Sequence, residues 1–308
     1  MKILVTGASG FIGGKIVAML AENAGNQIMA TGRSYTSIFN CYSNVTYTRQ
    51  DLSKEIPTRS FDICVHCAGL ADDRSPEEQF YLNNVKATGH LVASLQNCST
   101  LIFISSASVY DFSDGKEKDE ADTGISAPIS HYGKSKLQAE QMIAGSGIRS
   151  VYILRPRAVY GSGDRVLLPR ILKLIKRNRM ILPGELSSKT SLTHIQNLCE
   201  AVSKSIIQSK PGIQVFNIAD NRIYDLRSVF AAILLRKTGS KKFIQLPRPV
   251  ARLFIAVNSI LKLKTSLSIQ SLNYISQHSV LSINKAIEQL GYKGNLDFYS
   301  SLNQLDIE

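Results

Sequence analysis

Tyr132 and Lys136 stand four residues apart in the segment Tyr132-Gly133-Lys134-Ser135-Lys136. On a helix, this spacing places the two side chains on one face. A free phenol has a pKa of about 10, and a neighbouring ammonium group favours the phenolate and lowers that pKa. Tyr132 can therefore exchange a proton with a hydroxyl or ketone near neutral pH, as general acid–base catalysis requires. Tyr132 and Lys136 are also candidates to contact a bound cofactor, of which Lys136 can hold a ribose.

Hydroxyl side chains follow a strongly apolar run, Leu101–Ile104, in the segment Ser105–Tyr110. If this run is a strand of an open α/β sheet, the hydroxyls lie at its carboxyl end, where such sheets bind ligands. Ser106 can donate a hydrogen bond to the reacting oxygen and polarise it, and Ser108 is a second candidate near the substrate. Turn formation and helix capping are the alternative roles, more so for Ser108.

A glycine-rich turn joins an expected strand, Lys2–Thr6, to an expected helix. Gly7 permits a tight turn, Gly10 lets the backbone approach a pyrophosphate, and Gly13 lets the helix pack closely on the strand. The N-terminus of the helix then offers free N–H groups and a positive dipole end to the phosphates. The dinucleotide site predicted here consists of Gly7, Ser9, Gly10, Phe11, Ile12 and Gly13.

The end of the second expected strand, Gln27–Thr31, lacks the acidic residue that usually holds the adenosine ribose of NAD. Arg33 and Ser34 follow this strand instead. Because they can hold a 2′-phosphate, they favour NADP over NAD as the cofactor. The alternative for Arg33 is a surface charge in a loop.

Asp51 and Leu52 follow the third expected strand, Val45–Arg49. This position lets Asp51 reach the adenine of the cofactor. The alternative is that Asp51 caps the following turn, because Asp51-Leu52-Ser53 also suits an N-cap.

Short apolar runs alternate with helical stretches in the first half of the chain, which is the pattern of a doubly wound parallel sheet. We predict an α/β, Rossmann-like fold with an NAD(P)-binding domain over residues 1–165. A smaller, mostly helical substrate-binding part is expected over residues 166–308, with residues 191–220 returning to the first domain. The expected strands are Lys2–Thr6, Gln27–Thr31, Val45–Arg49, Ile63–His66, Leu101–Ser105, Val151–Leu154 and Val215–Ala219, and the expected helices are Phe11–Glu22, Glu77–Gln96, His131–Ala144, Val166–Asn178, Thr193–Ser205, Leu226–Thr238, Val250–Leu263 and Ser282–Leu290.

Composition and charge narrow the class of protein. The 308 residues are 44% hydrophobic, which suffices for a large core, and they carry a net charge of +12 without a basic arm or a nucleic-acid motif. We therefore expect a small-molecule substrate and no nucleic-acid partner. Five irregularly spaced cysteines and no export signal indicate reduced thiols in the cytoplasm. The segment Cys64-Val65-His66-Cys67 falls in an expected strand, so no metal site is expected.

No apolar stretch approaches the roughly 18 residues that a membrane-spanning helix needs, so we expect no integral membrane segment. The segment Pro249–Lys264 has an apolar centre and basic flanks. It could lie on a membrane surface, but we expect an amphipathic helix that packs on the substrate side.

Together these blocks resemble the extended short-chain dehydrogenase/reductase family, also called the NAD-dependent epimerase/dehydratase family. The similarity covers nearly the whole chain. It implies that Ser106, Tyr132 and Lys136 form a catalytic triad. The matching blocks are Thr6–Gly13, Val65–Gly69, Asn84–Thr88, Ser105–Tyr110, Tyr132–Lys136 and Leu154–Gly161.

The resemblance also implies further roles. Cys67, Ala68, Gly69, Pro156 and Ala158 are expected to line the cofactor, and a homodimer is expected to form through Glu77–Gln96 and His131–Ala144.

The sequence departs from the family pattern at several points. Asp111 stands where the family commonly has glycine, and Arg157, a candidate substrate contact, stands where a smaller residue is frequent. No acidic pair follows Ser106, which disfavours a dehydratase.

Two substrate classes stay open. The segments Arg155–Asp164 and Lys285–Tyr292 are similar to 3β-hydroxysteroid dehydrogenase-like and 3-oxoacyl-type reductases, whereas Leu182–Gly184 and Ser191–Ile195 look like the lining of a nucleotide-sugar pocket. In a 4-epimerase or 4-ketoreductase, the diphosphate would meet Arg165, Arg170 and Lys173, unless these are surface charges.

We favour hydride transfer at a secondary alcohol or ketone, because it needs only the triad. The alternative of another class is an inactive NAD(P)-sensing protein, which the intact triad disfavours.

Overall fold

The computed structural model describes residues 1–54, 56, 58–72, 75–123, 130–183, 186–247, 249–250 and 277–307. Its main element is a seven-stranded sheet in the order β14-β8-β7-β5-β1-β2-β3, with every neighbouring pair parallel. This confirms the predicted α/β, Rossmann-like fold, and β14 is one edge strand of the described sheet. The strands are β1 (Lys2–Thr6), β2 (Gln27–Gly32), β3 (Val45–Arg49), β5 (Ile63–His66), β7 (Thr100–Ile104), β8 (Ser150–Pro156) and β14 (Gly212–Ile218).

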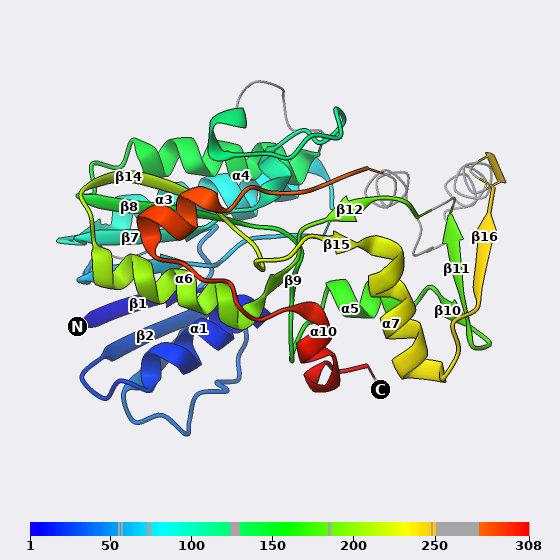
Figure 1. Ribbon diagram of the computed structural model, residues 1–308. Coiled ribbons are helices and arrows are strands. Elements are labelled where there is room, and N and C mark those ends of the chain that lie inside the picture. The colour runs from blue at the N-terminus through cyan, green and yellow to red at the C-terminus, as the bar shows by residue number, and fades with distance from the viewer. Residues whose placement is uncertain are drawn as a thin grey trace.

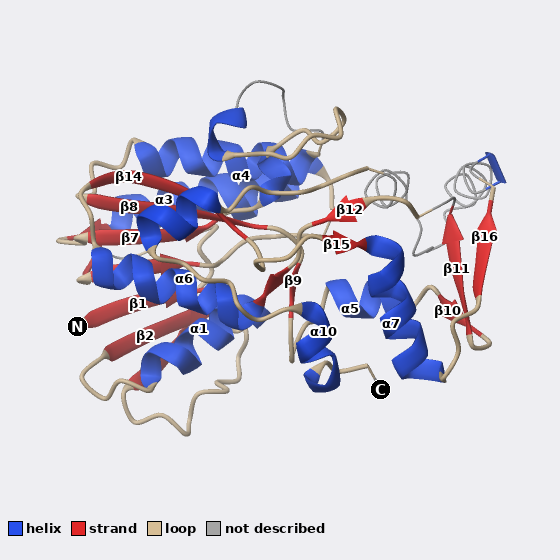
Figure 2. Ribbon diagram, viewed as in Figure 1, coloured by secondary structure: helices blue, strands red, loops and turns tan. Residues whose placement is uncertain are grey.

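Helices cover both faces of the sheet (Figures 1 and 2). On one face lie α1 (Phe11–Ala21) and α6 (Ile195–Gln208), and on the other lie α3 (Ala87–Ser94) and α4 (His131–Ala144). Because successive side chains of a strand point to opposite faces, each strand feeds both layers.

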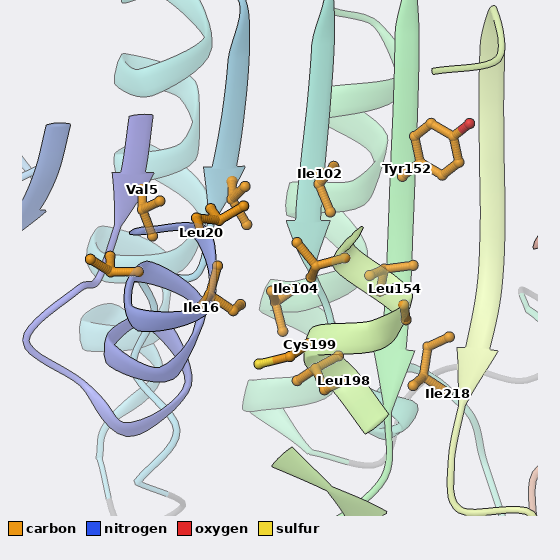
Figure 3. Packing of buried hydrophobic residues seen from close by; sticks show 14 of the residues in the cluster. Val5, Ile16, Leu20, Ile102, Ile104, Tyr152, Leu154, Leu198, Cys199 and Ile218 are labelled. Atoms are coloured by element: carbon orange, nitrogen blue, oxygen red, sulfur yellow. The ribbon is translucent and has the colours of Figure 1, made fainter. Parts of the chain in front are cut away.

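The packing on the α1 and α6 face forms the largest core. Val5 of β1 and Ile104 of β7 pack there with Ile16 of α1 and Leu198 of α6 (Figure 3). Leu4 points the other way and packs with side chains of α3 and α4. The apolar composition of the strands is thus explained by burial on both sides.

The helix expected over Glu77–Gln96 is interrupted. It starts as α2 (Glu77–Phe80), continues as a π-helical stretch, η1 (Tyr81–Lys86), and ends as α3 at Ser94. Leu95–Gln96 forms the short strand β6, which pairs with β4 (Arg59–Ser60).

The helix expected over Val166–Asn178 is wrong beyond its first half. It ends as α5 (Leu167–Leu172), and β10 (Ile175–Lys176) and β11 (Arg179–Pro183) follow as a hairpin. Arg177 and Asn178 form the two-residue turn with φ angles of 46° and 59°. Both residues having positive φ is typical of a tight hairpin turn whose twist matches the strands.

The remaining part of the chain covers the carboxyl end of the sheet, beside α5 (Figure 1). Its helix α7 (Leu226–Thr238) has the expected bounds, and the helix expected over Ser282–Leu290 includes the π-helical stretch η4 (Ala286–Leu290). The helix expected over Val250–Leu263 lies outside the described residues except for Val250. The other elements are β9 (Val159–Tyr160), β12 (Lys189–Thr190), β13 (Thr193–His194), β15 (Tyr224–Asp225), β16 (Phe243–Leu246), α10 (Phe298–Ser301) and the 3₁₀ turns η2 (Ala107–Val109), η3 (Glu120–Asp122) and η5 (Leu302–Gln304).

A second apolar core fills this part of the molecule, and α5, α7, α10 and β11 all contribute side chains to it. Among the described residues, no helix is both long enough and apolar enough to cross a membrane.

Candidate active site

A cavity of about 520 Å³ lies at the carboxyl edge of the sheet. It reaches the loops that follow β1 and β5, which are neighbouring strands of the sheet. From this pair, the order of the strands along the chain runs outward in opposite directions. Such a switch point is where open α/β sheets form a ligand crevice. The described lining residues come from the glycine turn, from the serine segment after β7, from α4 and from the α5 and α7 side.

The glycine turn is held in place by the protein's own backbone. Gly7 has a φ of +68°, and a Cβ built on it would lie 2.7 Å from the backbone nitrogen of Ala68. A Cβ on Gly13 would lie 2.4 Å from the carbonyl oxygen of Gly7. Gly10 has an ordinary φ of −87° and starts α1. The turn therefore leaves the N-terminus of α1 facing the cavity, with no side chain at these three positions.

Most of the predicted cofactor contacts reach this cavity. Gly7, Gly10, Phe11, Ile12 and Gly13 line it. Ser9 is outside the lining. Its side chain packs against Gly32 instead, so closely that a Cβ built on Gly32 would lie 2.5 Å from Ser9 Oγ. At the end of β8 and in the segments that follow β5 and β8, the lining includes Cys67, Gly69, Pro156 and Ala158, but not Ala68.

Ala158 has a φ of 46°, a left-handed conformation that is uncommon outside glycine. Backbone strain of this kind is concentrated at ligand sites.

The candidates for adenosine binding lie outside the cavity lining, beside the ends of β2 and β3. Arg33 donates to Asn83 Oδ1 at 3.2 Å, and Ser34 forms a local turn with Thr36. Asp51 accepts from the backbone N–H and the hydroxyl of Ser53 at 3.0 and 2.8 Å. These bonds hold the pKa of Asp51 below its usual value, helped by the charge of Arg33. Asp51 thus makes the turn-capping contacts of the alternative prediction.

Leu52, the last of these candidates, is buried.

Ser106, Tyr132 and Lys136 all line the cavity. Lys136 is buried, and its Nζ donates to the carbonyl oxygen of Ile104 at 2.6 Å and lies 4.0 Å from the ring centre of Phe103. Burial lowers the pKa of Lys136 to about 7, against the opposing effect of the nearby Glu140 carboxylate.

The other two members of the set are more exposed than Lys136, since Tyr132 and Ser106 are each only partly buried. Tyr132 is half-buried, with its ring 6.0 Å from that of Phe80. Ser106 Oγ accepts from the backbone N–H of Ser108 at 3.1 Å and donates to Ser108 Oγ at 3.2 Å. It therefore caps the turn η2 while it faces the cavity.

A buried ionic network under the site was not foreseen from the sequence. Glu140 accepts from Arg155 at both carboxylate oxygens, at 2.9 and 2.6 Å, and from Ser105 Oγ at 2.5 Å. Arg155 also donates to Tyr110, whose hydroxyl donates to Asn217 Oδ1 at 2.7 Å. Burial raises the pKa of Tyr110 to about 12, so its hydroxyl stays protonated.

A signal for this network existed in the sequence. Glu140 follows Lys136 by four residues and therefore lies on the same buried face of the helix, where a carboxylate requires a charged or hydrogen-bonding partner.

Only some of the candidate substrate contacts reach the cavity. Ser108, Arg157 and Arg170 line the cavity, whereas Arg165 and Lys173 are exposed and outside the lining. Arg157 donates to Ser279 Oγ at 2.9 Å. The side chain of Arg170 is about half-exposed, and its Nη2 lies 3.8 Å from Asp72 Oδ1.

Comparison with known proteins identifies the family. Residues 3–219 match the model of the NAD dependent epimerase/dehydratase family. The N-acetyl-alpha-D-glucosaminyl-diphospho-ditrans,octacis-undecaprenol 4-epimerase of Escherichia coli O157:H7 is 26% identical over 263 residues, covering 82% of this chain and 77% of that protein. A 4-hydroxy-2-methyl-3-oxo-4-farnesyl-3,4-dihydroquinoline-1-oxide ketoreductase of Stigmatella aurantiaca is 24% identical, covering 99% of this chain and 96% of that protein.

The fold is also that of solved enzymes. The structure of UDP-glucuronic acid 4-epimerase from Bacillus cereus in complex with NAD superposes with a TM-score of 0.76, at 20% identity, covering 99% of this chain and 97% of that one. The chain therefore belongs to the NAD dependent epimerase/dehydratase family and is an enzyme of the oxidoreductase type.

Proposed function

We propose that this enzyme transfers a hydride between a nicotinamide cofactor and a secondary alcohol or ketone, with Ser106, Tyr132 and Lys136 as its catalytic residues. The observation that carries the proposal is that these three side chains line one cavity together with the glycine turn at the N-terminus of α1. Residues 1–165 with 191–220 would hold the cofactor, and most of 166–308 would form the substrate side.

The roles follow from the chemistry of each group. The cofactor, when bound, supplies or accepts the hydride at the carbon of the reacting group. Tyr132 gives its phenolic proton to the ketone oxygen during reduction, or takes the hydroxyl proton during oxidation. Ser106 donates a hydrogen bond to the same oxygen and so stabilises the charge that develops on it.

Lys136 supports the tyrosine. Its ammonium form favours the phenolate of Tyr132 by charge. An ammonium group has three donors, and the Ile104 carbonyl accepts from one of them at 2.6 Å. We assign another donor to the nicotinamide ribose.

We propose NADP as the preferred cofactor. Arg33 and Ser34 follow β2, and Arg49 at the end of β3 donates to the Arg33 carbonyl oxygen at 3.2 Å. Two guanidinium groups near the adenosine end suit a 2′-phosphate better than a bare ribose. NAD is the alternative, and the family as a whole is NAD-dependent.

The substitution Tyr132→Phe tests the catalytic assignment. It removes the only group assigned to proton transfer, so we expect turnover to fall about 10²- to 10⁴-fold. NADPH binding, measured by quenching or enhancement of nicotinamide fluorescence, should be unchanged. Tyr35→Phe is the matched control, because Tyr35 is 84% exposed and outside the described lining, and it should leave the turnover intact. Equal turnover of wild type and Tyr132→Phe would contradict the assignment, and the absence of turnover in both proteins would favour a sensing role.

A nucleotide-sugar 4-epimerase or 4-ketoreductase is the second candidate. Arg170 on the cavity wall favours it, because a guanidinium group can meet a diphosphate. The UDP-glucose 4-epimerase of Vibrio cholerae is among the relatives, at 26% identity over 264 residues.

We further propose a homodimer that forms through Glu77–Gln96 and His131–Ala144. The exposed side chains of Tyr81 and Met142 on these segments support it. The five free thiols support a cytoplasmic location.

A further inference from the structure

Beyond the catalytic side chains, the cavity runs into the second apolar core. Its wall there is made by Leu168 and Ile171 of α5, Leu174 just after it, Val229 and Phe230 of α7, and Phe298 of α10. All six side chains also belong to the second core cluster and are buried. We call the space that they enclose the apolar chamber.

Polar groups that reach the chamber are already engaged within the protein. The Asp164 carboxylate accepts from the backbone N–H groups of Val166, Leu167 and Leu168 at 2.8 to 3.0 Å. Thr190 Oγ1 is bonded to Ser191 O and to Ser279 Oγ, at 3.1 and 3.0 Å. These groups stabilise the protein's own loops, so the part of the chamber wall that the structure describes presents mainly carbon to a ligand.

Among the residues that the structure describes, no lysine or arginine belongs to the wall of the chamber. Of the arginines on the described cavity wall, Arg157 bonds to Ser279, and Arg170 is half-exposed beside Asp72. Arg165 and Lys173, which a diphosphate would be expected to meet, are outside the lining. A diphosphate inside the chamber would lose its hydration without gaining donors, which is strongly unfavourable.

We propose that the substrate of this enzyme carries its reacting alcohol or ketone on an apolar skeleton or chain, and that this apolar part occupies the chamber. Apolar cavities of this kind stay poor in water and bind apolar ligands. The inference rests on the proposed function for the identity of the reacting group. The apolar character of the rest of the substrate is inferred from the wall of the chamber alone.

A homologous series of methyl ketones tests the proposal. The NADPH-loaded enzyme is mixed with 2-butanone, 2-hexanone, 2-octanone or 2-decanone, and both thermal stabilisation and NADPH oxidation are followed. Each methylene that enters the chamber should tighten binding about fourfold, the value for a buried CH₂ group. UDP is the opposing probe and should give no stabilisation.

Val166→Glu provides the matched variant. Val166 lines the cavity beside α5 and is 46% exposed, so a glutamate there places charge at the entrance without disturbing the core. We expect the dissociation constant of 2-decanone to rise at least tenfold and that of 2-butanone to change little. Ile207→Glu is the control, because Ile207 is 78% exposed on α6 and outside the lining.

The outcomes separate this inference from the proposed function. Binding that grows with chain length but without NADPH oxidation would support the chamber and contradict the proposed chemistry. Stabilisation by UDP, or no gain with chain length, would overturn the apolar substrate. In that case a UDP-linked ketone that is reduced in a Tyr132-dependent way would leave the proposed chemistry standing.

Discussion

Lys136 shows how a residue's role depends on neighbours that its spacing does not reveal. The four-residue interval to Tyr132 predicted one helical face, and both side chains line the same cavity. The bond from Lys136 to the Ile104 carbonyl was not predictable, because it depends on how α4 crosses β7. Likewise, Ser106 was expected either to face the substrate or to cap a turn, and in the structure its position allows both.

Arg33 is the residue on which the cofactor preference depends. We expect Arg33→Ala to weaken NADPH binding about 10- to 100-fold, the range for a lost charge-assisted hydrogen bond, and to leave NADH binding nearly unchanged. Titration of the nicotinamide fluorescence with each cofactor gives both constants. Arg149→Ala should change neither constant, because Arg149 is exposed and lies just before β8, at the amino end of the strand. Equal losses for the two cofactors would remove the support for NADP.

Among the elements, α4 depends most on a charged contact. Its Glu140 is joined to Arg155 of β8 by two hydrogen bonds, and both side chains are buried. Neutralising one partner leaves the other charge buried without compensation.

We therefore expect Glu140→Gln to lower the free energy of unfolding by about 3 to 5 kcal/mol. Urea denaturation followed by far-ultraviolet circular dichroism measures this, since the chain has no tryptophan. Glu78→Gln on the exposed surface of α2 should stay within about 0.5 kcal/mol of the wild type. A loss under 1 kcal/mol for Glu140→Gln would mean that the pair contributes little.

The elements that the sequence predicted well have a strong periodic pattern and clear ends. His131–Ala144 begins at the capping Ser130 and is followed by Gly145, and its observed bounds agree with the prediction. The π-helical stretch inside Glu77–Gln96 has no comparable mark, because it changes hydrogen bonding without breaking the helix. The hairpin at Arg177 and Asn178 was missed because its turn lacks glycine, the usual residue at positive φ.

At the scale of the whole molecule, Asp220 lies where the two cores meet. Its carboxylate accepts from Tyr160 and Tyr224 hydroxyls, from Asn197 Nδ2 and from the backbone N–H of His194, at 2.6 to 2.8 Å. These partners come from β9, β15 and the start of α6. One buried group therefore connects the sheet to the substrate side.

The protonation of Asp220 should make overall stability depend on pH. Burial raises its pKa to about 6 from an ordinary value of 3.8, although its hydrogen bonds oppose this. The folded protein thus binds the proton more tightly than the unfolded chain. The stability that protonated Asp220 adds to the folded protein is full below about pH 4. It is lost as the pH rises through 6, by about 3 kcal/mol in all.

Asp220→Asn should abolish this part of the pH dependence. Urea midpoints at pH 4, 5, 6 and 7 would fall less steeply with rising pH than those of the wild type, although the variant is less stable overall. Asp306→Asn, an exposed carboxylate that accepts from the backbone N–H of Gly163, should keep the wild-type slope. The same slope in Asp220→Asn and wild type would show that the Asp220 pKa is not raised.

The sheet could be predicted from the sequence, whereas the contacts that join the two cores could not. Apolar strands and their order along the chain indicate a parallel sheet, because local composition records burial on both faces. The junction at Asp220 and the apolar chamber depend on contacts between distant segments of the chain, such as that of Tyr160 with Asp220, which are 60 positions apart. No local pattern reports such encounters.

The glycine turn determines which residues would still be conserved in a descendant of this protein that had lost its activity. Gly7 and Gly13 are required by the backbone around them, at Ala68 and at Gly7 itself, before any cofactor arrives. A descendant that had lost its enzymatic activity would therefore still conserve both glycines, under selection for folding alone. Tyr132 is half-buried and has no such backbone requirement, so its replacement, and not that of the glycines, would mark the loss of function in related genomes.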